Sequence, residues 1–373
     1  MKQVTFRQLA CYCGFILMSM KVLSLPSLLY SFNQRGGLVV GLLLMMVEVL
    51  MIVLALFIKR KFPNMALYEL ISMKLGKFVA KFVYFLLAVV VFCQLSFLMN
   101  EYINYMRDFV YEEITSIYFV AVFLPIASCL VFNGLKNFAR TMELSFIFVI
   151  IAFAFCLFVG EGAIQLDELG PFFINGTNGF FSSLFNISFF FSDFIFIFMI
   201  LDKVKEPQKS YFSFFVVLGI VFVLMAFLYI SYFGLYSTTA YFHKNAIANV
   251  TEYGRIIGNV GNLDIFTTLF CLFSLFFQGT IFFYQLKIIY EKIFGYENKV
   301  HSLIVINIIT LILQFIVFVD LGTITNFITT TMRYWSILTF GLIPLYLIFL
   351  LLFVKKWRRR SEYNKKILQK NNK

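Results

Sequence analysis

The chain has 373 residues, of which 61% are hydrophobic and 13% are charged, and its formal net charge is +12. A soluble globular protein is about a quarter charged and about half apolar, so this composition excludes a soluble fold and predicts an integral membrane protein. Most of the positive charge lies between the apolar runs and at the C-terminal end. We therefore do not interpret it as a signal for nucleic-acid binding.

Apolar runs of about 20 residues, the length at which a helix crosses a bilayer, recur along the chain. They predict ten membrane spans, at residues 7–31, 37–58, 79–103, 117–133, 141–160, 180–201, 211–234, 264–290, 301–321 and 334–354. We expect an all-α polytopic membrane domain over residues 1–354, followed by a basic cytoplasmic tail over residues 355–373.

The orientation follows from the Lys and Arg residues, which gather on the cytoplasmic side of membrane proteins. If the N-terminus is cytoplasmic, 25 of the 31 Lys and Arg residues fall on inside segments, 5 fall outside, and Lys21 remains in the membrane. Both termini are therefore predicted to be cytoplasmic.

Two connecting segments have a pattern of their own. Residues 64–76 predict a short helix on the inner surface, with Asn64 as its N-cap and Gly76 as its end. Residues 236–262, on the outside, are polar and contain a helix-like piece at Ala246–Ile257. Each segment is expected to be either an ordinary connector or part of a gate, and the sequence alone leaves both readings open.

The middle of the first span is unusually polar, since it contains Ser19, Lys21, Ser24 and Pro26. A charge at that depth costs about 3 kcal/mol on insertion scales. Pro26 removes a backbone donor and crowds the preceding turn, so the helix should bend or break there. We interpret this stretch as half of a polar site in the middle of the membrane.

Two carboxylates are predicted to lie at the depth of Lys21. Glu48 and Asp193 fall within a few residues of their span midpoints, and a rise of about 1.5 Å per residue places all three charges within a few ångströms in depth. Pairing of Lys21 with Glu48 or Asp193 would offset much of the cost of burying them. The group is either a structural ion pair or a ligand or proton site.

Polar residues also form rows on the third, sixth and eighth spans. Such rows either line a water-filled path or hold helices together by hydrogen bonds. The candidate ligand-binding residues are Ser19, Lys21, Ser24, Gln94, Asn186, Ser188, Ser192, Asp193, Ser274 and Gln278. The candidates for proton transfer or ion pairing are Lys21, Glu48 and Asp193, and we expect no metal site and no catalytic residue.

Ten spans divide into two sets of five, about 7–160 and 180–354, and an odd number per set inverts the second set relative to the first. Spans 1 and 6 then correspond, and both carry polar interruptions near the midplane. This pattern predicts an inverted repeat with discontinuous helices 1 and 6, as in transporters. Free helix ends supply amides for a carboxylate and carbonyls for a cation, so an amino acid is the natural ligand.

Several stretches of the chain have a familiar pattern: Val4–Leu9, Lys21–Tyr30, Tyr68–Lys77, Asn133–Glu143, and Phe190–Phe194 followed by Lys203–Lys209. Together they resemble spore germination permeases, the B subunits of germinant receptors. The resemblance implies the five-plus-five fold of the amino acid–polyamine–organocation superfamily, with a small germinant, commonly an amino acid, bound within spans 1, 3, 6 and 8. It also implies a complex with a larger membrane subunit and a lipoprotein in the inner membrane of an endospore. We expect the chain in the bacterial cell membrane or in that inner membrane of the spore.

By position, Lys21–Ser24 and Ser188–Asp193 match the two unwound regions of that superfamily. Lys21 is a departure, because the superfamily usually has small or glycine-rich sequence at the first break. An ammonium group there would either replace a coupling cation or bind a ligand carboxylate.

Three functions are compared. The first is a germinant-sensing, permease-like subunit whose ligand shifts a conformational balance. The second is a stand-alone, proton-coupled amino-acid transporter in which Glu48, Asp193 or Lys21 titrates. The third is a membrane enzyme. The sequence contains no metal-binding cluster, no catalytic triad and no phosphate-binding glycine loop, so we expect neither enzymatic activity nor a cofactor.

Overall fold

The computed structural model describes residues 4–63, 65–109, 116–160, 166–170, 172, 176–205, 211–234, 264–295 and 298–352. Over these residues the chain is helical, and the one β feature is an isolated bridge between Val4 and Val204. The predicted outer segment 236–262, the tail 355–373 and Asn64 lie outside the described residues.

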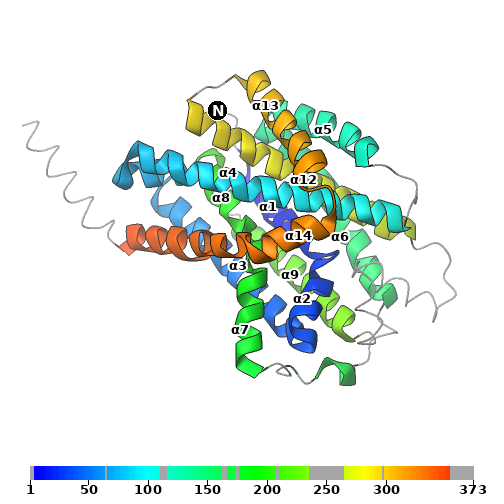
Figure 1. Ribbon diagram of the computed structural model, residues 1–373. Coiled ribbons are helices and arrows are strands. Elements are labelled where there is room, and N and C mark those ends of the chain that lie inside the picture. The colour runs from blue at the N-terminus through cyan, green and yellow to red at the C-terminus, as the bar shows by residue number, and fades with distance from the viewer. Residues whose placement is uncertain are drawn as a thin grey trace, which may run out of the picture.

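The helices follow the predicted apolar segments (Figure 1). They are α1 (Phe6–Met18), α2 (Leu25–Asn33), α3 (Gly37–Lys61), α4 (Leu67–Phe109), α5 (Ser116–Phe132), α6 (Leu135–Gly160), α7 (Gly176–Ile187), α8 (Ile195–Ile200), α9 (Tyr211–Gly234), α12 (Asp264–Phe294), α13 (Lys299–Ile312) and α14 (Leu321–Thr330). A further helical stretch runs over 332–352.

Within the described part of the chain, eight helices are long and apolar enough to cross a membrane, and α1 and α5 are shorter apolar helices. Large apolar side chains such as Leu50, Phe148 and Phe212 are exposed on the outside of the bundle. In water such a surface would favour aggregation or association, whereas lipid tails cover it. The chain is therefore an all-helical integral membrane protein, and the count of ten spans remains a prediction.

The first apolar segment is interrupted, as the sequence predicts. The α-helix ends at Met18, Ser19–Lys21 form a 3₁₀ turn (η1), and bends follow at 22–24 before α2 starts at Leu25. Pro26 lies in the first turn of α2, a position where its missing N–H has no partner to lose. The break therefore precedes Pro26, and the proline starts the second helix.

The sixth apolar segment differs from the expected broken helix. Between α7 and α8 the chain stays helical but winds as a 3₁₀ helix over Ser188–Phe194 (η5), and all seven residues are buried. Runs of 3₁₀ helix longer than three or four residues are uncommon and often mark strain or a hinge. The predicted interruption is therefore a change of helical winding and not an unwound stretch.

The two interrupted segments form the centre of the bundle. Every residue of α1 except Arg7 is buried, and so is every residue from Ser188 to Leu201. In Figure 1, α1 lies in the middle, and it packs against α3, α6, α9 and α12. Helices α4 and α12, which pack along each other, cover one side. Helices that are buried all round can carry polar groups away from lipid.

One end of the bundle, here named the basic end, joins segments far apart in sequence. The backbone N–H of Val4 donates to the carbonyl of Lys203 at 2.9 Å. The ammonium group of Lys59 donates to the carbonyl of Leu201 at 2.7 Å. Lys203 donates to the hydroxyl of Tyr284 at 2.8 Å. These contacts tie the N-terminus, α3 and α12 to the end of α8.

The predicted short helix before the third span is confirmed. Gly76 has φ 88° and ψ 163°, which are not helical angles. They divide α4 into the short helix before Gly76 and the long helix after it. Leu67, Leu70 and Ile71 are buried, and the Glu69 carboxylate accepts from the ammonium group of Lys292 at 2.5 Å. The short helix thus packs by its apolar face and is linked to α12.

Gly41 on α3 marks a close helix contact that can be tested. A Cβ atom there would lie 2.6 Å from the ring of Tyr229 and 2.9 Å from Leu29. We expect Gly41→Ala to destabilise the protein by about 1–3 kcal/mol through overpacking. The measurement is the thermal unfolding midpoint in detergent.

The matched control is Gly219→Ala on α9, where nothing lies within 4 Å of an added Cβ. This variant should be neutral or slightly more stable, because alanine is the better helix former. Equal midpoints for the two variants would contradict the close contact at Gly41.

Candidate functional site

Lys21 is the centre of a fully buried charged cluster. Its ammonium nitrogen lies 2.9 Å from Glu48 Oε1 and 3.1 Å from both Asp193 Oδ1 and Oδ2. It also donates to the backbone carbonyl of Ile16 at 2.9 Å. All three charged side chains have 0% exposure. The sequence predicts pairing with one of the two carboxylates, and the structure shows contact with both.

The interruption of the first segment creates this position. Where α1 gives way to the 3₁₀ turn Ser19–Lys21, the Ile16 carbonyl becomes available to a side chain, and the negative end of the α1 dipole favours a cation. The ring of Phe191 lies 5.4 Å from the ammonium nitrogen. The backbone carbonyl of Lys21 accepts from the hydroxyl of Tyr229 at 3.2 Å. Lys21 is thus held by backbone and side chain.

The two carboxylates accept different numbers of hydrogen bonds. Asp193 also accepts from the Gln278 amide at 3.2 Å, so three donor contacts reach it. Glu48 accepts from Lys21 with one oxygen, while its buried Oε2 has no hydrogen-bond partner among the described residues. The cluster therefore holds one ammonium group and two carboxylates away from water, and removing one member leaves an uncompensated charge.

Glutamine side chains fix the 3₁₀ segment and the helix after it. The Gln94 amide donates to Ser192 Oγ at 3.2 Å and to the carbonyl of Phe189 at 3.4 Å. The Gln285 amide donates to the carbonyl of Phe196 at 3.2 Å. Gln94, Ser192 and Gln278 were predicted as site residues. Gln285 lies on the predicted polar face of the eighth span but was not among the candidates.

A third buried carboxylate lies on the other side of the first break. Glu101 on α4 is 1% exposed, and its Oε1 accepts from the backbone N–H of Ser24 at 3.0 Å and from the Ser24 hydroxyl. Ser24 was a predicted site residue, whereas Glu101 was not. Its place on the polar face of the third span, seven residues after Gln94, is a signal that the sequence does contain.

Ser24 also lines a cavity of about 460 Å³ between α2, α4 and α14, here named the serine groove. Its walls combine hydroxyl and amide groups with a few apolar side chains, and none of the described residues that line it is charged. These residues are Ser24, Ser27, Leu28, Ser31, Phe97, Leu321, Gly322, Thr325, Asn326 and Thr329.

Four predicted site residues have other surroundings. Asn186 accepts from the guanidinium group of Arg333 at 2.8 Å. The hydroxyls of Ser188 and Ser274 donate to carbonyls of their own helices. Ser19 is the first residue of the 3₁₀ turn after α1. These contacts of Asn186, Ser188 and Ser274 do not include a member of the Lys21 cluster.

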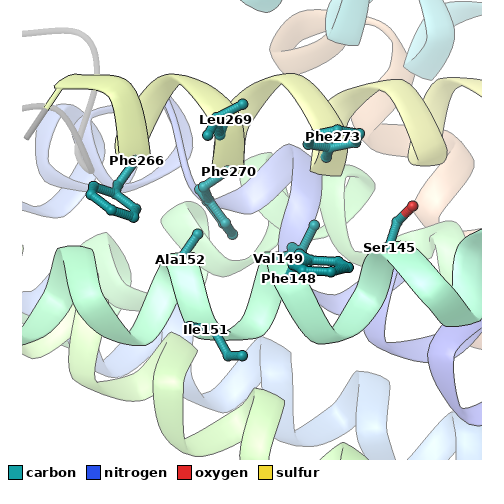
Figure 2. Close-up of a pocket in the computed structure, with 9 residues that line it drawn as sticks. All are labelled: Ser145, Phe148, Val149, Ile151, Ala152, Phe266, Leu269, Phe270 and Phe273. Atoms are coloured by element: carbon teal, nitrogen blue, oxygen red, sulfur yellow. The ribbon is translucent and has the colours of Figure 1, made fainter.

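A second cavity, of about 340 Å³, differs in chemistry and place. It lies between α6 and α12 and is lined almost wholly by apolar side chains, among them Val149, Phe266 and Phe270 (Figure 2). Phe148 and Ile151 beside it are exposed on the outer surface of the bundle. A polar small molecule would find few hydrogen-bond partners there, so we place the candidate site at the Lys21 cluster and the serine groove.

The sequence profile of the spore germination protein family matches residues 3–320. The chain belongs to the spore germination protein family. A comparison with curated proteins gives no match. The resemblance noted from short stretches such as Lys21–Tyr30 is therefore confirmed over nearly the whole chain. The protein is a germination-related, permease-like membrane protein, and this class favours a receptor or transporter over an enzyme.

Proposed function

We propose that the chain is the permease-like subunit of a spore germination receptor and that it binds a small germinant, an amino acid, in the middle of the membrane. The proposal also includes ten spans in two inverted halves and cytoplasmic termini. It places the chain in the inner spore membrane. It is supported by the family and by the buried charged cluster where the two interrupted segments meet.

The observation that carries the proposal is the position of Lys21. Its ammonium group is surrounded by oxygen atoms of Ile16, Glu48 and Asp193, much as a bound metal cation would be. We therefore favour the role of a built-in cation over that of a partner for a ligand carboxylate. A ligand that alters the contacts of η5 or of the first break would change this cluster and shift the conformational balance.

The serine groove supplies the room for a ligand. Ser24, three residues after Lys21, lines it, and the volume of the groove suits a small molecule. Hydroxyl groups along it suit a polar, zwitterionic solute. The response would pass to a larger membrane subunit and a lipoprotein subunit, the partners that the family relationship suggests, while lipid surrounds the remaining surface.

The excess of buried carboxylates over ammonium groups favours one alternative, a stand-alone proton-coupled amino-acid transporter. The two functions differ in whether the solute crosses the membrane. We expect the purified protein to be thermally stabilised by a subset of the standard amino acids, and the same compounds to trigger germination of spores that carry the full receptor.

The deciding measurement is uptake of the stabilising amino acid into vesicles that contain this chain alone. Binding without uptake supports the receptor subunit, whereas uptake driven by a pH gradient supports the transporter. If no amino acid stabilises the protein or triggers the spores, the proposed function is wrong.

A further inference from the structure

Glu101 is a buried carboxylate with no cation paired to it in the described part of the chain. Its Oε1 accepts two hydrogen bonds from Ser24, and its buried Oε2 has no partner among the described residues. The salt bridges that the structure shows in this part of the bundle join Lys21 to Glu48 and Asp193 and leave Glu101 out. A buried, ionised carboxylate is costly unless it is paired, so this position calls for a positive charge.

The serine groove lies directly beside this carboxylate. Ser24 lines the groove and donates to Glu101, so the carboxylate is one side chain behind the groove wall. Phe97, also on the wall, precedes Glu101 by one turn of α4. No charged side chain among the residues that the structure describes lines the groove. A cation that enters it meets acceptor oxygens and a nearby negative charge, with no competing ammonium or guanidinium group on the walls.

The walls also indicate what kind of cation fits. Ser24, Ser27 and Ser31 lie at positions i, i+3 and i+7 of α2 and so share one face, and Thr325 and Thr329 line the opposite wall on α14. Hydroxyl oxygens accept hydrogen bonds from an ammonium group. The volume exceeds that of a bare metal ion and suits a small organic molecule.

We infer that the Ser24–Glu101 pair recognises the ammonium group of a small organic amine bound in the serine groove. Glu101 supplies the compensating negative charge. The Ser24 hydroxyl donates to Glu101, and Ser24 lines the groove. This inference deepens the proposed function, on which its role in germination rests, because it names the chemical group that selects the ligand. The Lys21 cluster, whose ammonium group is already paired with two carboxylates, is a separate element of the site.

The test uses four probes of matched size: butylamine, 2-aminobutyrate, 2-hydroxybutyrate and butyrate. Binding to the purified, full-length protein is measured by thermal stabilisation and calorimetry at constant ionic strength and millimolar concentration. We expect the two amines to bind and the two compounds without an amino group to bind at least tenfold more weakly. Equal binding of all four probes, or stabilisation by none, overturns the inference.

Two variants test the residues. Glu101→Gln keeps the shape of the side chain and removes its charge, so it should weaken butylamine binding at least tenfold. Glu143→Gln is the matched control, because it makes the same chemical change at a carboxylate that pairs with Arg7 and does not line the groove. It should change the affinity by less than about twofold. Unchanged butylamine binding by Glu101→Gln overturns the inference.

A third variant covers the case in which Glu101→Gln does not fold. Glu101→Asp keeps the charge but withdraws it by one methylene, and it should fold and bind butylamine with intermediate affinity. Affinity equal to that of the unmodified protein counts against recognition by Glu101. A germination assay separates the inference from the proposed function. If spores with Glu101→Gln respond normally to an amino acid, the inference is wrong and the proposed function is unaffected.

Discussion

Lys21→Ala is expected to abolish the germination response while the protein still inserts into the membrane. The substitution removes the one ammonium group that Glu48 and Asp193 share and leaves both carboxylates buried. Removing one partner of a buried ion pair typically costs about 3–5 kcal/mol. We therefore also expect a clearly lower thermal unfolding midpoint of the purified protein. Dose–response curves of spores carrying the variant give the functional result.

Two controls separate the charge of Lys21 from general damage. Lys77→Ala makes the same chemical change at an exposed position and should leave response and midpoint unchanged. Combining Lys21→Met with Glu48→Gln and Asp193→Asn makes the cluster neutral, so it should regain much of the lost stability without regaining the response. A normal dose–response curve for Lys21→Ala would remove Lys21 from the site.

Asp193→Asn is expected to shift the pH dependence of the response. With both carboxylates ionised, the Lys21 cluster carries one excess negative charge, which one bound proton neutralises. In the variant, Lys21 and Glu48 balance each other, and Gln278 faces an amide in place of a carboxylate. The cluster then no longer needs a proton to be neutral. Germination or ligand binding measured across a pH series gives the profile.

The matched variant is Glu48→Gln, which also removes one negative charge. Asp193 receives three donor contacts and Glu48 one, so Asp193→Asn should lower the unfolding midpoint more, by a difference of about 1–2 kcal/mol in stability. If the pH profile of Asp193→Asn matches that of the unmodified protein, Asp193 has a structural role alone.

The charged cluster could be predicted because a charge inside an apolar run is visible in the sequence and is costly to bury in a membrane. Lys21, Glu48 and Asp193 are charges in the middle of apolar runs, and the rise of a helix fixes their depth. Depth does not say which helices are neighbours, so the sequence left open which carboxylate Lys21 contacts. In the structure Lys21 contacts both carboxylates.

Other features depend on tertiary packing that no local pattern encodes. The sequence placed the first break at Pro26, but the chain bends before it and the proline starts α2. The contact of Glu101 with Ser24 joins two helices whose relative rotation a single sequence does not reveal. Asn186 and Asp193 are both predicted ligand-binding residues on the sixth span, yet Asn186 accepts a hydrogen bond from Arg333, far along the chain.

The seven-residue 3₁₀ segment has a mechanical consequence. A 3₁₀ helix rises about 2.0 Å per residue and an α-helix about 1.5 Å, so rewinding Ser188–Phe194 as an α-helix would shorten the rod by about 3.5 Å. Because α8 is buried on all sides and the Lys59 ammonium group holds the Leu201 carbonyl at the basic end, such a change of length would displace α7 relative to α8. Asp193 lies within this segment, so a change in its contact with Lys21 would act directly on the residues whose winding sets that length.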